Sequence, residues 1–162
     1  MITIALYNNK TYIVNNYDNK YVLITDQQDK ADDGFTHDIS FYTKQIVLSD
    51  PKLISLYNLK LKADYNTNLP KVPVTWNVEF GQDTIKNNKL KLIFWHGILP
   101  GWFGDDKTIS HQYIDFKDIG QCYAEYTYYK KNGQLFNDGP MHMFAKISVD
   151  ELAQIVNYIN DI

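Results

Sequence analysis

The sequence predicts an α+β protein, in which a mostly antiparallel sheet has two helices packed across it, over about residues 50–57 and 149–161. Three observations support this class. Runs of β-branched and aromatic residues recur between Asn, Asp and Gly turns, and several of these runs alternate apolar with polar residues. The chain also contains the same pattern twice, after Lys44 and after Lys146. In each case a strand that ends in aromatic-x-Lys is followed by a Ser and then by apolar residues at helical spacing.

The first part of the chain is predicted to open as a meander of short antiparallel strands. Its turns fall at residues 8–10 and 18–20, because Asn and Asp adopt turn conformations that β-branched residues resist. Residues 26–34 are predicted to form a solvated loop, since their acidic part lacks the alternating oxygen ligands of a calcium site. The strands predicted here cover residues 2–7, 11–14, 21–25 and 39–47.

The first helix is predicted at residues 50–57. Ser49 stands at an N-cap position, and Pro51 suits the first helical turn. Leu53 and Leu56 follow that Ser at the +4 and +7 positions, which is the spacing of one helix face. Residues 59–63 then alternate as a strand with one solvent-facing side.

The chain is expected to be one compact unit over residues 1–162, or two strand-rich halves over residues 1–66 and 74–162. Pro70 and Pro73 restrict residues 67–73 to extended forms, which is typical of a linker. Beyond it, alternating runs predict strands at residues 74–80, 89–95 and 122–129.

The second helix is predicted with a defined start. Glu151 lies three residues after Ser148, so the two form the sequence pattern of a capping box. The apolar stripe that this helix must bury consists of Leu152, Ile155, Val156 and Ile159.

Composition narrows the possible partners and the location. The apolar runs are far shorter than the about 20 residues of a membrane span, and residues 1–6 contain neither a basic leader nor a cleavage site. We therefore expect a cytoplasmic protein without a membrane partner; the single Cys122 agrees with a reducing compartment. All 16 basic residues are Lys and the formal net charge is −3. This composition disfavours nucleic-acid binding, although the missing Arg also fits AT-rich codon usage.

The sequence contains no recognisable catalytic, metal or cofactor motif. Its histidines lack the i,i+2 and i,i+4 spacings of a local metal site: His37, His96, His111 and His142. His96, at a strand end beside Gly97, is the best placed of them for a role. Cys122 lies in an alternating strand where a buried, inert thiol is usual, and neither a Gly-x-Ser-x-Gly elbow nor a phosphate-binding glycine loop occurs. We therefore expect a protein that is not an enzyme and needs no metal or cofactor.

Residues 95–106 contain two Trp and one Phe, and the three Gly and one Pro among them indicate a loop. Large aromatic side chains in a loop either fold back onto a core or await a partner. The first alternative gives a plug at the end of the sheet. The second gives a contact surface with aromatic anchors and charged neighbours. The candidate partner-binding residues are Trp95, His96, Trp102, Phe103, Asp105 and Asp106.

About residues 11–60 resemble the repeating unit of small immunity-type proteins encoded beside secreted toxins in Gram-positive bacteria. The resemblance follows the strand at residues 21–25, the Gly34-Phe35 pair, the aromatic-x-Lys pattern of Tyr42 and Lys44, and an acid-started short helix from Ser49-Asp50 to Tyr57. The second half of the chain departs from this pattern, since only the final strand-to-helix step recurs. The resemblance implies a binding protein that neutralises a toxin.

We thus expect a non-enzymatic protein-binding protein, with an immunity protein against a cognate toxin as its specific form. The alternative is a small-molecule-binding protein or small hydrolase, whose pocket lies near Trp95, His96 and Trp102 and is bordered by Tyr126 and Tyr128. A homo-oligomer is a third possibility, because it needs only an exposed strand edge for pairing.

Overall fold

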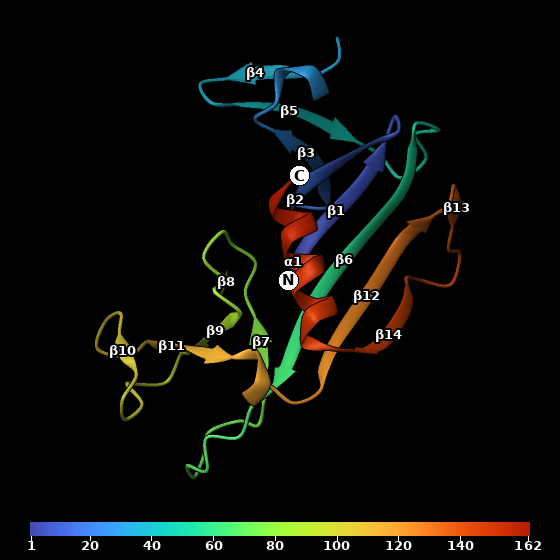
Figure 1. Cartoon of the computed structure of the whole chain (residues 1–162). Helices are drawn as coiled ribbons and strands as arrows, with labels where there is room; N and C mark the ends of the chain where they lie inside the picture. The colour runs from blue at the N-terminus through green and yellow to red at the C-terminus, as the bar shows by residue number, and fades with distance from the viewer. The chain divides into compact units, whose positions relative to one another are not determined.

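The structure, a computed structural model, describes all residues from 1 to 162, and 49% of them lie in strands (Figure 1). The strands are β1 (Ile2–Tyr7), β2 (Lys10–Tyr17), β3 (Lys20–Thr25), β4 (Thr36–Asp38), β5 (Phe41–Ile46), β6 (Leu53–Asp64), β7 (Thr75–Val78), β8 (Ile85–Lys86), β9 (Lys89–Phe94), β10 (Phe103–Gly104), β11 (Ser110–Asp115), β12 (Cys122–Lys131), β13 (Gln134–Leu135) and β14 (Met141–Ile147). Two short 3₁₀ turns, η1 (Gln28–Lys30) and η2 (Phe116–Asp118), and one α-helix, α1 (Val149–Asn160), complete the chain. No helix has the length and apolar character that a bilayer-spanning segment needs.

The chain divides into two compact units. Unit 1 contains residues 1–59, 125–143 and 162, and unit 2 contains residues 60–124 and 144–161. The long strands β6 and β12 and the strand β14 supply residues to both units. The predicted linker at residues 67–73 lies inside unit 2, and the later residues 125–143 return to unit 1.

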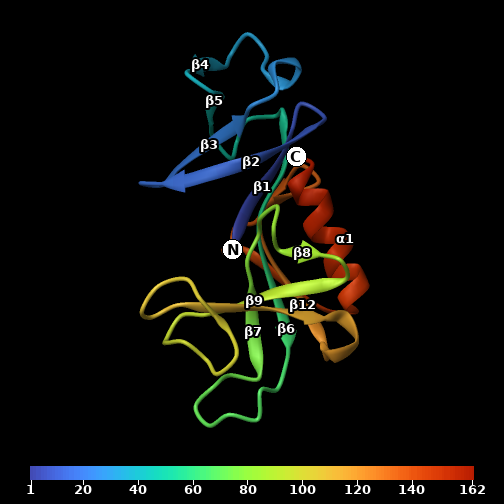
Figure 2. The same ribbon diagram turned by 60° about the vertical axis from the view of Figure 1, so that its left-hand side comes forward.

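Unit 1 is built on the N-terminal meander that the sequence predicts. β1, β2 and β3 pair antiparallel in chain order, β5 follows β3, and β4 lies at the edge (Figure 2). The β1–β2 turn places Asn8 and Asn9 at φ 49° and 62°, and the β2–β3 turn places Asp18 and Asn19 at φ 51° and 59°. Asn and Asp tolerate this left-handed region, so the residue types of these turns match the tight hairpins they form.

The core of unit 1 gathers side chains from the meander and from β6. Its buried members are Ala5, Tyr7, Tyr12, Val14, Leu23, Ile46, Leu53 and Leu56. The ring of Phe35, in the loop before β4, stacks on Tyr12 with ring centroids 5.6 Å apart. Burial of this apolar surface is the main force that holds the strands of unit 1 together.

The predicted helix over residues 50–57 is wrong, so α1 is the only long helix and the fold is not a sheet with two helices. Asp50 begins a turn instead: its side chain accepts the N–H of Lys52 at 2.9 Å, and its carbonyl accepts the N–H of Leu53 at 3.0 Å. The chain then continues as the 12-residue strand β6.

A β-bulge accounts for the helix-like spacing of apolar residues. Leu6 pairs with Ser55 but Tyr7 pairs with Leu53, so Ile54 is an extra residue in β6. The extra residue reverses the alternation of side chains, and Leu53 and Leu56 become buried on the same core although they lie three residues apart. Two apolar residues at that spacing fit a bulged strand as well as a helix.

Unit 2 contains a separate four-stranded sheet, with the strand order β10-β11-β9-β8, as well as β7 paired with the end of β6. The predicted strand at residues 89–95 is confirmed as β9, whereas β11 was not predicted. The predicted closing helix is confirmed as α1, and its capping box is formed by Ser148 and Glu151. Its buried residues are Leu152, Ala153, Val156 and Ile159. Near its end, the Asn160 side chain donates to the carbonyl of Gly81 at 3.1 Å.

Candidate functional site

The small sheet of unit 2 has one buried face and one face on which polar and aromatic side chains gather. Leu90 and Leu92 of β9 and Ile114 of β11 are buried. Residues alternate between the faces of a strand, so their neighbours point the other way. In the register of the sheet, Lys91 pairs with Tyr113, Ile93 with His111, and His111 with Phe103. We name the side formed by Lys91, Ile93, Phe103, His111 and Tyr113 the open face.

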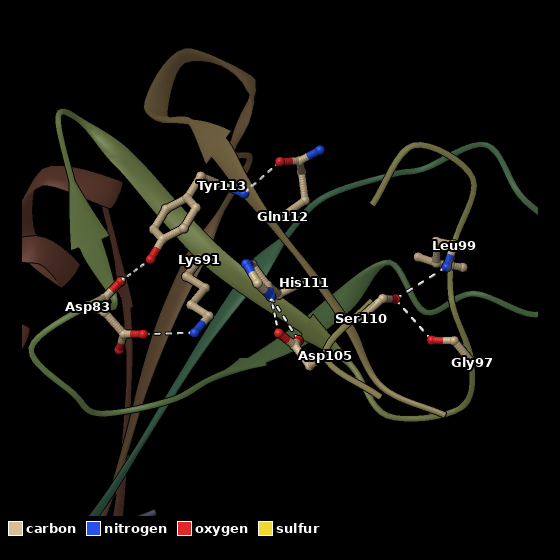
Figure 3. A network of polar contacts seen from close by, with 9 residues as sticks. All are labelled: Asp83, Lys91, Gly97, Leu99, Asp105, Ser110, His111, Gln112 and Tyr113. Carbon is tan, nitrogen blue, oxygen red and sulfur yellow. Dashed lines mark hydrogen bonds and ion pairs between the residues drawn. The ribbon is translucent and has the colours of Figure 1, made fainter. Parts of the chain in front are cut away.

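His111 lies at the centre of the open face. Its Nδ1 is 2.8 Å from Oδ1 and 2.7 Å from Oδ2 of Asp105, in the loop before β11 (Figure 3). Because an ionised carboxylate only accepts hydrogen bonds, Nδ1 carries the proton in this contact. Phe103 stacks on the imidazole with centroids 5.6 Å apart, and Tyr113 meets it edge-on at 6.0 Å. Asp105 therefore fixes the ring on which Phe103 rests.

A second polar group borders the open face at Lys91. Its Nζ is 2.8 Å from Oδ2 of Asp83, and the Tyr113 hydroxyl donates to the Asp83 carbonyl at 2.8 Å (Figure 3). The hydrogen bond from Lys91 lowers the pKa of the Asp83 carboxyl, and the same bond raises the pKa of Lys91. The Asp83 side chain is 55% exposed, so solvent screens much of this attraction and the pair mainly fixes geometry.

The structure separates the two adjacent aromatic residues Trp102 and Phe103. Trp102 is half-buried and stacks on the buried Trp76 with centroids 5.4 Å apart. Trp76 in turn donates its Nε1–H to the carbonyl of Tyr65 at 2.9 Å. Phe103, in contrast, is 66% exposed on the open face. Trp102 thus folds back into unit 2, as the first sequence alternative expects, and Phe103 lies at the surface.

The loop that carries the aromatic residues is anchored to β11 through Ser110. The Ser110 hydroxyl donates to the Gly97 carbonyl at 2.9 Å and accepts the Leu99 N–H at 3.2 Å. This anchoring leaves Trp95 and Ile98, each 53% exposed, outside the buried part of unit 2. The hydrogen bonds of Ser110, on the buried face of the sheet, thus fix the loop that carries these exposed apolar side chains.

The remaining predicted site residues have mixed surroundings. Asp106 is exposed, and its Oδ1 accepts both the N–H (2.6 Å) and the hydroxyl (3.0 Å) of Thr108. These hydrogen bonds lower the pKa of the Asp106 carboxyl, and the bond from the Thr108 N–H has the largest effect. His96 is exposed and meets the edge of Phe94 at 5.9 Å. Trp95, His96, Phe103, Asp105 and Asp106 are thus at the surface, and Trp102 is partly covered.

Several residue types that could support chemistry have structural roles. No group of three His, Cys, Asp or Glu side chains is arranged to hold a metal ion. Cys122 is buried, and desolvation raises the pKa of its thiol to about 11, so the nucleophilic thiolate is scarce near neutral pH. Ser110 is fully buried and points away from His111, since the two residues are neighbours on one strand. His37 and His142 belong to unit 1, where they contact Tyr42 and Thr127.

Sequence reasoning missed Lys91, Tyr113 and the central position of His111. The only signal was the alternation of Ser110, His111, Gln112, Tyr113 and Ile114, which is too short to predict a strand by itself. Comparison with protein-family models, with curated proteins and with solved structures found no match to this chain.

Proposed function

We propose that this chain is a non-enzymatic protein-binding protein and that its docking surface contains Trp95, Ile98 and Phe103. The observation that carries the proposal is Phe103, which is 66% exposed while its ring is held on His111. An exposed aromatic side chain with a fixed orientation loses little conformational freedom when a partner covers it, and such residues are typical interface anchors. The acidic residues Asp105 and Asp106 are exposed in the segment that follows Phe103.

In its specific form, the proposal is that the protein acts in the cytoplasm as an immunity protein and occludes a domain of a cognate toxin. The support is the resemblance of residues 11–60 to such proteins, together with the exposed aromatic surface of unit 2. A toxin partner would be encoded beside this chain, so the product of the neighbouring coding sequence is the partner to test.

The test measures the affinity of the purified chain for that product. Phe103→Ala is expected to weaken binding by about 2 kcal/mol or more, which is roughly 30-fold, if Phe103 is an anchor. Phe144→Ala is a matched control because Phe144 is 59% exposed in the same unit and packs on Tyr123 at 5.6 Å. Equal binding by wild type and folded Phe103→Ala would reject this docking surface.

A second candidate function, a small-molecule-binding protein or hydrolase, is favoured by one observation, the contact between His111 and Asp105. A carboxylate that holds Nδ1–H leaves Nε2 as the basic nitrogen, which could accept a proton from a bound water. The side chains in contact with His111 are those of Asp105, Phe103 and Tyr113, so water would have to be the nucleophile.

Hydrolysis of p-nitrophenyl acetate separates the two functions. A hydrolase would lose about tenfold or more of its rate in His111→Gln, because general-base catalysis requires the imidazole. A binding protein would give the same slow background rate in both forms. His96→Gln serves as the control, since His96 is exposed and has no carboxylate contact of this kind.

A further inference from the structure

The thioether sulfur of Met143 is accessible and lies in contact with a cation. Met143 belongs to the part of β14 that lies in unit 1, and the residue is 44% exposed. The ammonium group of Lys131, at the end of β12, donates to this sulfur, with 3.5 Å between Nζ and Sδ. A thioether sulfur is a weak acceptor of hydrogen bonds, so the contact covers one side of the sulfur without burying it.

A second contact holds the ammonium group of Lys131 in place. Its Nζ lies over the ring of Tyr128, 5.0 Å from the centroid. A cation within about 6 Å of an aromatic centroid is attracted by the ring. The Tyr128 ring in turn contacts the rings of Tyr57 and Tyr126, with centroids 5.0 and 6.0 Å away. The cation therefore has a defined position beside the Met143 sulfur.

The chemistry open to such a sulfur is oxidation. In the reaction with hydrogen peroxide, a sulfur lone pair attacks one peroxide oxygen and the O–O bond breaks. The departing hydroxide takes the proton of the transferred oxygen and leaves as water, so the sulfur loses two electrons and the peroxide is reduced. The product is a sulfoxide whose sulfur is chiral. Attack through one or the other of the two lone pairs gives one or the other epimer.

We propose that Met143 is a site of stereoselective oxidation by peroxide, in which Lys131 occupies one lone pair of the sulfur and directs the oxidant to the other. Methionine sulfoxide reductases act on one epimer each, so this selectivity assigns the reduction of oxidised Met143 to one class of these enzymes. The inference concerns residues of unit 1 and is independent of the proposed docking surface, which lies in unit 2.

Limited oxidation of the purified chain with hydrogen peroxide tests the proposal. Proteolysis and mass spectrometry measure the sulfoxide formed at each methionine, and treatment of the peptides with a reductase of each class and a dithiol gives the ratio of the epimers. We expect one epimer to exceed the other by about threefold or more at Met143, since a weak hydrogen bond shifts a ratio by roughly this factor. Met1, which is 68% exposed, should give nearly equal epimers.

Three variants separate the effect of the cation from that of the surrounding chain. Lys131→Leu removes the donor and should give nearly equal epimers at Met143, whereas Lys131→Arg keeps a donor and should keep the excess. Lys20→Leu is the matched control, because Lys20 is an exposed lysine of β3 in the same unit and should leave the ratio unchanged.

Two kinds of result would overturn the proposal. Equal epimers at Met143 in the wild type, or the same excess in Lys131→Leu, would show that Lys131 does not direct the oxidant. Oxidation of Met143 more than about tenfold slower than that of Met1 would show that its sulfur is not an accessible site.

Discussion

The ammonium group of Lys44 lies against Gly34, such that a Cβ atom added to Gly34 would stand 2.5 Å from Lys44 Nζ. Lys44 also lies over the rings of Tyr7 and Phe35, 5.0 and 5.8 Å from their centroids, and 3.5 Å from Oδ1 of Asp32. The N–H of Gly34 donates to the same Asp32 oxygen at 2.9 Å. The Gly-Phe pair and the aromatic-x-Lys pattern thus meet in one structural cluster of unit 1, which ties the loop before β4 to β5.

Gly34→Ala should therefore destabilise the protein by about 1 kcal/mol, because the new methyl group displaces Lys44 from Asp32 and from the two rings. Urea unfolding measures the change. A double-mutant cycle with Lys44→Met supplies the control, since the methyl group then meets a flexible, uncharged side chain. Equal costs of Gly34→Ala in both backgrounds would show that Lys44 is not the group displaced.

The Asp32 carboxylate makes the stability of unit 1 depend on pH. The N–H of Gly34 is the main group that lowers the pKa of Asp32 below its ordinary value of 3.8, and Lys44 adds to the shift. A carboxyl whose pKa is lower in the folded state stabilises the protein above its unfolded pKa, and this contribution is lost as pH falls through the folded pKa.

Asp32→Asn should thus lower stability at neutral pH and flatten its decline on the acid side of 3.8. The free energy of unfolding, measured in urea from neutral pH downward, reports both effects. Asp33→Asn is the matched control because Asp33 is the exposed neighbour in the same loop. A decline in Asp32→Asn as steep as in wild type would contradict the assignment to Asp32.

Much of the fold follows from local patterns, and its one large error has a local cause. The Asn-rich turns predict the meander because those residues adopt positive φ, and Ser148 with Glu151 predicts the start of α1 because a capping box needs no distant contact. The error at β6 arises from the bulge at Ile54, which depends on the pairing partners in β1. Register between strands is not encoded in the spacing of a single strand.

The candidate site was predictable only in part for the same reason. The aromatic loop is visible in the sequence, so Trp95 and Phe103 could be selected from composition alone. Phe103 lies beside His111 because of the register between β10 and β11. Lys91 lies beside Tyr113 because of the register between β9 and β11. The different burial of Trp102 and Phe103 likewise depends on contacts between segments, because Trp102 stacks on Trp76 and Phe103 stacks on His111.

Lys130 offers a test of a buried cation in unit 1. It is 4% exposed, and its Nζ donates to the carbonyls of Leu48 and Asp50 at 2.7 and 3.0 Å. Lys130→Met should destabilise the protein by about 1 to 3 kcal/mol, because both carbonyls lose a charged donor inside the protein. Thermal and urea unfolding measure the loss. Lys20→Met, at the exposed first residue of β3, should change stability by less than about 0.5 kcal/mol; similar losses in the two variants would refute the role of Lys130.

The separation of Trp102 from Phe103 predicts different consequences for two neighbouring substitutions. Trp102→Ala removes the ring stacked on Trp76 and should cost about 2 kcal/mol, less than a fully buried Trp because Trp102 keeps some exposure. Phe103→Ala should cost less than about 1 kcal/mol, since most of its surface is already in water. Urea unfolding gives both values, and near-ultraviolet circular dichroism should lose the Trp76–Trp102 signal only in Trp102→Ala. If Phe103→Ala proved the more destabilising of the two variants, the prediction that Trp102 supports the fold more than Phe103 does would be wrong.

Because Trp102 supports the fold, partner affinity is best tested with Phe103→Ala alone. A variant that combined both substitutions would mix loss of partner contact with loss of structure.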